Sequence, residues 1–313
     1  MVKKLLTTTV AAVALATSAC ASYGDTYSAS DSAPALGNVA AEGQVDPAVW
    51  KLSDEDTTVY LLGTFHLLPK DLEWRTDTID AALAASDEIY FEIEDDLRDP
   101  SAIMPLIQSM AIDPTQPSLA ERIGDENAAR VAELLTPAGI PAQALNIMEN
   151  WFIALTLSSV TAMKFGYDTD SGVEIVLRGD VDERGLPVKG LETAEEQLGH
   201  LDGMSAEAQT MFLTESLVPD EEMRATLDGM LESWKRGDID GIAATFNEGA
   251  PIGSEVRQAL LTNRNADWTG DIVERMGQPG TVFVAVGAGH LVGDDSVINM
   301  LAEKGYVATR IDD

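Results

Sequence analysis

Two histidines of this 313-residue chain occur in the same local pattern, and histidine is both the commonest metal ligand and the usual general base in proteins. Gly63-Thr64-Phe65-His66 follows the apolar run 59–62, and Gly287-Ala288-Gly289-His290 follows the apolar run 282–286. Each run predicts a short buried strand that ends in a tight turn at the glycine. In open α/β sheets ligands bind beyond the carboxyl ends of the strands, so two such ends could direct both imidazoles at one point. The chain has only three histidines, and the repeated pattern therefore predicts a shared site.

A carboxylate on another strand would complete a ligand set with these histidines. Residues 88–94 read as a strand that places Glu92 and Glu94 on one face and apolar side chains on the other. Two imidazoles and one carboxylate leave open coordination positions, and such a set suits Zn, Mn, Co or Fe. Glu92 is the first candidate and Glu94 the second. A solvated acidic strand face is the alternative interpretation.

The elements that must position these residues have the pattern of a mixed α/β domain. A strand within 46–52, the first histidine strand, a helical stretch opened by Pro69 and Asp71 that runs to Ala85, and the strand of Glu92 follow one another. Residues 101–276 are then mainly helical, and the last long helix runs from Arg257 to Met276. We therefore expect an α/β (α+β mixed) fold with a central mixed sheet flanked by helices. A large helical insert separates the two strand-G-x-x-H units.

Composition narrows the class of partner. The chain has 20 basic and 53 acidic residues and a formal net charge of −33. Such a surface disfavours nucleic acid and anionic membranes, whereas cations and metal ions are easier partners. The sequence contains neither a Walker loop nor a G-x-G-x-x-G motif.

The first residues have the pattern of a secretory signal. Two lysines, a short apolar stretch and small residues lead to Cys20, the only cysteine, so residues 1–20 are predicted to be a signal peptide. Small residues before a lone cysteine resemble a bacterial lipobox, although Thr17 stands where leucine is usual, and Cys20 would then be lipidated. The protein would face the periplasm, anchored to the cell membrane, in first place the outer one. The alternative is cleavage at Ala19-Cys20-Ala21 and secretion into the periplasm. Residues 21–45 are predicted to be a flexible linker and 46–313 a single domain.

Further residues carry a resemblance to a known family. The segments 61–66 and 286–291, the strand of Glu92, Gly190-Leu191-Glu192-Thr193 and Asn263-Arg264-Asn265 occur in the order seen in the TraB/GumN family. That family is similar to the Tiki metalloproteases, and the resemblance extends from Trp50 to Ile311. It implies an α/β fold and a site built from both G-x-x-H motifs, a glutamate and an arginine.

Carried over to this chain, the resemblance implies that His66, His290 and Glu92 bind a divalent metal, which leans towards Mn or Co while Zn stays open. Glu92 and Arg264 are the candidate catalytic residues. The guanidinium of Arg264 could stabilise an oxyanion or bind a peptide carboxylate, or it could form an ordinary surface ion pair. Glu192 either orients a ligand histidine from behind or caps a helix. His200 lacks the strand and the spacing, and we expect it to be structural.

Two functions follow. The first is a divalent-metal-dependent hydrolase of the bacterial cell envelope, in first place a peptidase, with a peptide or protein as substrate and a lipid anchor to the membrane. The alternative is a non-catalytic envelope lipoprotein with a binding or assembly role in polysaccharide or envelope biogenesis.

Overall fold

The computed structural model describes residues 45–311 except 97, 100, 102 and 250–253. The predicted signal peptide, the lipidation site Cys20 and all but the last residue of the predicted linker lie outside the described residues. The division of the chain into 1–20, 21–45 and 46–313 therefore stays a prediction. None of the helices in the described ranges combines the length and the apolar character needed to cross a membrane.

A six-stranded mixed sheet forms the centre of the fold, with the order β6-β4-β7-β2-β1-β8. Neighbours from β6 to β2 run parallel, whereas β1 is antiparallel to both β2 and β8. A separate two-stranded ribbon pairs β3 with β5. The strands are β1 (Val49–Ser53), β2 (Thr57–Thr64), β3 (Leu68–Pro69), β4 (Glu88–Ile93), β5 (Tyr167–Asp168), β6 (Val188–Glu192), β7 (Gly280–Gly287) and β8 (Thr309–Ile311).

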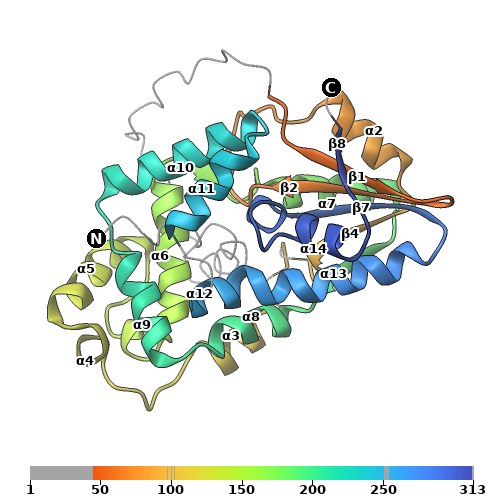
Figure 1. Ribbon diagram of the computed structural model, residues 1–313. Helices are drawn as coiled ribbons and strands as arrows, with labels where there is room; N and C mark the ends of the chain where they lie inside the picture. The colour runs from red at the N-terminus through yellow and green to blue at the C-terminus, as the bar shows by residue number, and fades with distance from the viewer. Residues whose placement is uncertain (1–44, 97, 100, 102, 250–253, 312–313) are drawn as a thin grey trace.

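Helices cover both faces of this sheet and form the long insert between β4 and β7 (Figure 1). The α-helices are α2 (Asp77–Ala85), α3 (Met104–Met110), α4 (Leu119–Ile123), α5 (Asp125–Leu135), α6 (Asn150–Lys164), α7 (Val173–Arg184), α8 (Ala194–Asp202), α9 (Ala206–Glu215), α10 (Asp220–Lys235), α11 (Ile239–Gly249), α12 (Glu255–Arg257), α13 (Asn263–Met276) and α14 (Val297–Glu303). Single turns are η1 (Thr136–Ala138), η2 (Ala144–Asn146), the π-turn η3 (Gln258–Thr262) and η4 (Ala288–Leu291). The predicted mixed sheet, flanking helices and helical insert are confirmed.

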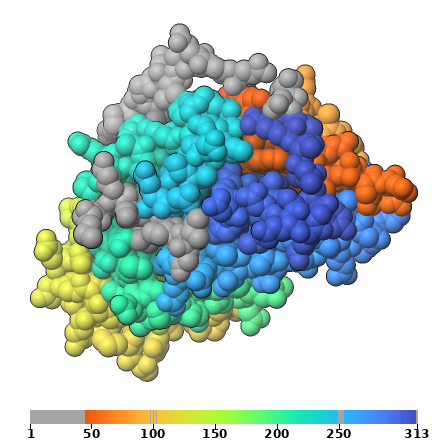
Figure 2. Space-filling view, in the orientation of Figure 1, coloured from red at the N-terminus to blue at the C-terminus, as the bar shows by residue number. Residues whose placement is uncertain are grey.

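The central strand β7 is buried on both faces, as its continuous apolar sequence requires. Val282, Val284 and Val286 belong to the apolar core that also holds Trp268 of α13, whereas Phe283 and Ala285 belong to the larger core shared with the insert. The sheet therefore separates two apolar layers. On the surface, the dark blue C-terminal segment lies beside the orange N-terminal strands (Figure 2), in agreement with the pairing of β8 with β1.

Two helix boundaries differ from the expectation. The first helix begins at Asp77 and not near Asp71, because the hydroxyl of Thr76 accepts a hydrogen bond from the Ile79 N–H and caps it there. The preceding Leu68 and Pro69 pair with β5 instead. The helix predicted from Arg257 to Met276 is present, but it contains the π-turn 258–262 directly before Arg264. Such turns shift the direction of the side chains that follow and are frequent at functional sites.

The insert also holds the two G-x-x-H loops in place. The indole N–H of Trp234 on α10 donates to the Gly63 carbonyl at 2.7 Å, where β2 ends. The ring of Phe246 on α11 packs against Gly289, and a Cβ at that glycine would lie only 2.5 Å from the ring. Glycine is therefore required at position 289 for α11 to cover the second loop.

Candidate functional site

The two histidines reach the same place because their strands are neighbours. β2 and β7 are parallel, with Gly63 opposite Val286 and Thr64 opposite Gly287, so both chains leave the sheet at the same edge. The Nε2 of His66 lies 3.9 Å and the Nε2 of His290 lies 3.7 Å from one oxygen of Glu92, Oε1. All three side chains are buried, with exposed fractions of 6% or less. The structure thus brings together the three residues predicted as metal ligands.

Gly287 allows this close convergence. Its N–H donates to Oε1 of Glu92 at 2.8 Å. A Cβ at this position would lie 3.1 Å from the same oxygen and 3.2 Å from the His66 Nε2, tighter than ordinary packing. The first glycine of the second motif therefore fixes the Glu92 carboxylate and also leaves room for the His66 ring.

Arg264 connects the second oxygen of Glu92 to Glu192. Its Nη2 donates to Glu92 Oε2 at 2.6 Å and to Glu192 Oε1 at 2.5 Å, while its Nε donates to Glu192 Oε1 at 2.9 Å. The arginine is only 2% exposed, so the surface ion pair considered from the sequence is wrong. The Arg264 pKa lies above its usual range, because Glu192 and Glu92 outweigh a large opposing effect of burial.

Glu192 at the end of β6 does not cap the following helix. Thr193 is the N-cap of α8 and forms a capping box with Glu196, and Glu192 instead accepts hydrogen bonds from Arg264 and Gln197. It therefore acts on His290 only through Arg264, whose Nη1 lies 3.2 Å from the His290 Nε2. Burial raises the pKa of Glu192, and the nearby guanidinium opposes that increase.

Glu174 is a site residue that the sequence reasoning missed. Its Oε1 lies 2.6 Å from the Nδ1 of His66 and also accepts a hydrogen bond from the Thr64 hydroxyl. Burial lowers the pKa of His66, but Glu174 and Glu92 together outweigh it and raise the pKa to about 9. The sequence gave one indirect signal, since Gly172 lies where a Cβ would collide with the His66 carbonyl oxygen. That glycine brings the first turn of α7, and with it Glu174, against the first G-x-x-H loop.

Asn265 and Gln197 also belong to the site although they were quoted only as part of a resemblance. The Asn265 Oδ1 lies 2.6 Å from the His290 Nδ1, and the Gln197 amide donates to Glu92 Oε2 at 3.1 Å. Burial and then the Arg264 charge hold the pKa of His290 well below its usual range. The pKa values of the two histidines are therefore shifted in opposite directions. His200 lies half-buried on α8, outside these contacts, as expected for a structural residue.

The donor set fits a divalent metal in type and position, with one condition. Within the described ranges, His66 is buried and its Nε2 has no hydrogen-bond partner, as expected of a ligand nitrogen facing an ion. No group of three or more His, Cys, Asp or Glu in those ranges is arranged to hold an ion as it stands. We attribute this to Arg264, because its Nη1 faces the same His290 nitrogen that a metal needs. Metal binding therefore requires the guanidinium to release His290.

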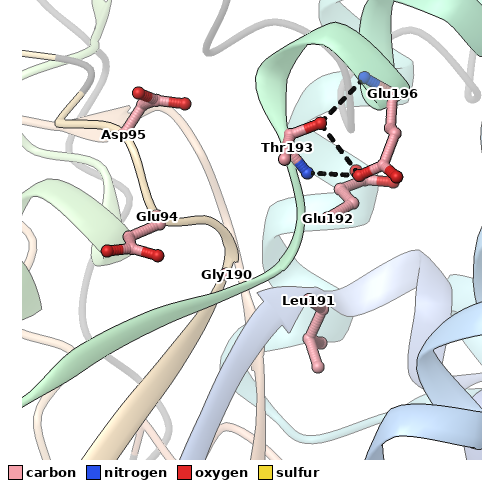
Figure 3. Close-up of a pocket in the computed structure, with 7 residues that line it drawn as sticks. All are labelled: Glu94, Asp95, Gly190, Leu191, Glu192, Thr193 and Glu196. Atoms are coloured by element: carbon pink, nitrogen blue, oxygen red, sulfur yellow. Dashed lines mark hydrogen bonds between the residues drawn. The ribbon is translucent and has the colours of Figure 1, made fainter.

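An acidic cleft of about 550 Å³ opens beside this cluster, at the carboxyl ends of β4 and β6. Figure 3 shows Glu94 and Asp95 on one side of it and Glu192, Thr193 and Glu196 on the other. Glu192 both lines the cleft and binds Arg264. Glu94 is exposed here and does not take part in the buried cluster, which favours Glu92 as the carboxylate of the site.

Comparison with known sequences places the chain. The sequence pattern of the TraB/PrgY/gumN family matches residues 48–310, which include every residue of the cluster. The chain belongs to the TraB/PrgY/gumN family. This TraB/PrgY/gumN chain is 24% identical to the uncharacterized protein YbaP of Escherichia coli over 249 residues, which cover 77% of this chain and 87% of YbaP. No solved structure matches the chain at a significant level.

Proteins named as metalloproteases are also similar to this TraB/PrgY/gumN chain. It is 24% identical to metalloprotease TIKI1 of Danio rerio over 324 residues, which cover 85% of this chain and 63% of TIKI1. It is 22% identical to human metalloprotease TIKI1, with 85% of this chain and 62% of TIKI1 covered. The chain thus spans less than two thirds of the length of these relatives. The family resemblance read from the sequence is confirmed, and a peptidase-like activity is the most that these names support.

Proposed function

We propose that this protein is a divalent-metal-dependent hydrolase that acts on peptides or proteins. The observation that carries the proposal is the position of Glu92 Oε1 within 4 Å of the Nε2 atoms of both His66 and His290. The histidines come from two loops that are more than 200 residues apart in the chain, and adjacent strands bring both to the same carboxylate oxygen. Names of relatives at 22–24% identity add support for the metal and for a peptide substrate.

The metal would be held by His66, His290 and Glu92, with Mn, Co and Zn as the candidates. A bound divalent ion supplies Lewis acidity, which polarises a carbonyl group and lowers the pKa of a water molecule. The protein supplies the rest of the site. Glu174 holds the ring of His66 from its far side, and Gly287 holds Oε1 of Glu92 in the direction of both imidazoles.

Arg264 would act on both the carboxylate and the substrate. Its Nη2 fixes Glu92 Oε2, and its Nη1 is the donor that faces the centre of the cluster. Once Nη1 is released from His290, it could stabilise negative charge on the oxygen of a substrate carbonyl. Because all the side chains of the cluster are buried, a substrate must approach through an opening, and the acidic cleft beside Glu192 is the nearest described one.

The test is a digest of a peptide library by metal-stripped protein to which Mn, Co or Zn is added. We expect cleavage with at least one metal, loss of cleavage in chelator, and no cleavage by the His66→Ala/His290→Ala double variant. His200→Ala is the matched control, because it removes the third histidine, which lies outside the site. Cleavage that persists in chelator or in the double variant would contradict the metal-dependent mechanism. No cleavage with any metal would favour the non-catalytic binding or assembly role.

We also propose that the protein works in the bacterial cell envelope, facing the periplasm and anchored by a lipid on Cys20. The support is the charged, apolar and small-residue pattern of residues 1–20, which lie outside the described structure. In Cys20→Ser we expect the protein to leave the membrane fraction and appear in the soluble periplasmic fraction, or to stay unprocessed. Unchanged membrane attachment of fully processed Cys20→Ser would argue against lipidation at this residue.

A further inference from the structure

The orientation of His290 is determined by two neighbours with opposite hydrogen-bonding abilities. On one side, the Asn265 Oδ1 lies 2.6 Å from the ring Nδ1. On the other side, the Arg264 Nη1 lies 3.2 Å from the ring Nε2. A guanidinium N–H can only donate, so a neutral imidazole must offer its lone pair at Nε2 and carry its hydrogen on Nδ1.

The amide of Asn265 can be assigned from its second contact. Its Nδ2 donates to the main-chain carbonyl of Asp295 at 2.8 Å. If the amide were reversed, its oxygen would face that carbonyl and its NH₂ would face the Nδ1–H of His290, so two attractive contacts would become repulsive. The amide oxygen therefore points at His290, where it accepts the Nδ1–H.

The Asp295 carbonyl is itself held in place. The Asp295 side chain accepts hydrogen bonds from the Arg257 Nε at 2.8 Å and from the Thr262 hydroxyl at 2.6 Å. Arg257 directly precedes the π-turn and Thr262 is its last residue, and both are on the same continuous helix as Asn265. One helix thus anchors the loop after His290 and also carries the residue that binds its ring.

We propose that Asn265 is a positioning residue that fixes His290 in the Nδ1–H tautomer, so that the Nε2 lone pair faces the point shared with His66 and Glu92. Trp268 stabilises the same ring orientation, because its ring lies 4.3 Å, centroid to centroid, from that of His290. The opposite tautomer would place two donors 3.2 Å apart at Arg264 and two lone pairs 2.6 Å apart at Asn265. As far as it concerns a metal, the inference rests on the proposed function, because ligand histidines are commonly oriented through their other nitrogen.

Nuclear magnetic resonance of ¹⁵N-histidine-labelled, metal-free protein at neutral pH tests the tautomer directly. The chain has only three histidines, so His66→Ala and His200→Ala assign the spectrum. We expect the His290 Nδ1 to show the ¹⁵N shift of a protonated nitrogen and its Nε2 that of a nitrogen with a free lone pair. In Asn265→Leu we expect a mixture of tautomers. In Asn265→Asp, which keeps an oxygen acceptor, the wild-type pattern should return.

Asn299→Leu is the matched control. Asn299 donates through its amide to the Gly293 carbonyl in the same loop but is not a neighbour of the His290 ring. We expect its ¹⁵N pattern to equal that of the wild type. His200 serves as an internal reference in every spectrum, because its shifts should not move. A wild-type protein with an Nε2–H His290, or an Asn265→Leu variant that keeps the wild-type pattern, would overturn the proposal. The wild-type result decides even where Asn265→Leu does not fold.

Calorimetric titration with Mn²⁺, Co²⁺ and Zn²⁺ separates this inference from the proposed function. For the metal that binds the wild type best, Asn265→Leu should bind about 10–100-fold more weakly, as is typical when the partner of a ligand histidine is lost, and Asn299→Leu should bind as the wild type does. An equal affinity in Asn265→Leu would overturn the positioning role. A wild type that binds none of the three ions but shows the Nδ1–H tautomer would contradict the proposed function and support the tautomer assignment.

Discussion

Replacing Arg264 by leucine is expected to lower the free energy of unfolding by about 3–5 kcal/mol, because the loss of one partner leaves buried charges without compensation. The guanidinium lies between the carboxylates of Glu92 and Glu192, whose side chains are at most 8% exposed. Without it, two like charges would face each other in an apolar surrounding, and the His290 Nε2 would lose its donor. Urea denaturation of the metal-free variant and the metal-free wild type measures the difference.

Two comparisons show whether charge is the cause. Arg75→Leu removes an arginine that also binds two carboxylates, those of Asp80 and Asp180, but at the surface, so we expect a cost of about 1 kcal/mol or less. Adding Glu192→Gln to Arg264→Leu removes one of the two opposed charges and should restore part of the lost stability. A stability change for Arg264→Leu no larger than that for Arg75→Leu would show that Arg264 does not neutralise the buried pair.

The second large effect is expected at Glu92. Glu92→Gln should reduce peptide hydrolysis on the order of 10³-fold, the range found when a group acting directly on the reaction is lost. It should also weaken metal binding, because a neutral amide replaces the carboxylate that both histidines face. The variant keeps the size of the side chain and an oxygen that can accept the Gly287 N–H, so it is a mild change for the fold.

Glu94→Gln provides the matched control for Glu92→Gln. Glu94 lies two residues further along the chain, and it was the second candidate from the sequence. It is exposed at the cleft rather than buried, and its replacement should change hydrolysis by only a few fold. Equal losses in Glu92→Gln and Glu94→Gln would mean that the cleft, and not the buried cluster, carries the activity. Circular dichroism and metal titration of both variants check that each is folded and which of them has lost the ion.

The part of the site that was predictable from the sequence lies on strands. The apolar runs before Gly63 and Gly287 identify two buried strands, and the carboxyl ends of parallel neighbours must meet at one edge of a sheet. The side-chain alternation of β4 likewise selected Glu92 and Glu94. Burial then separated the two, since Glu92 faces the histidines and Glu94 faces solvent. That difference depends on what packs above the strand, which the pattern of a single strand does not contain.

The residues that the sequence reasoning missed come from helices of the insert. Glu174 and Gln197 occupy the first turns of α7 and α8, where acidic and polar residues are common for reasons of capping alone. Nothing in the period of these helices shows that their first turns meet the sheet edge. The two contacts of Arg264 were hidden for the same reason, because Glu92 is 172 and Glu192 is 72 residues away along the chain.

The place of β7 in the sheet has a consequence for a chain that is still being made. β7 lies between β4 and β2, so before residues 280–287 are synthesised the sheet is divided into β1 with β2 on one side and β4 with β6 on the other. Each half then has an open edge of unpaired main-chain groups, which invites pairing with other chains. The helices of the insert, whose contacts are local, can form earlier. A nascent or interrupted chain therefore has His66, Glu92 and Arg264 without the strand that joins them, and it is exposed to aggregation until β7 closes the gap.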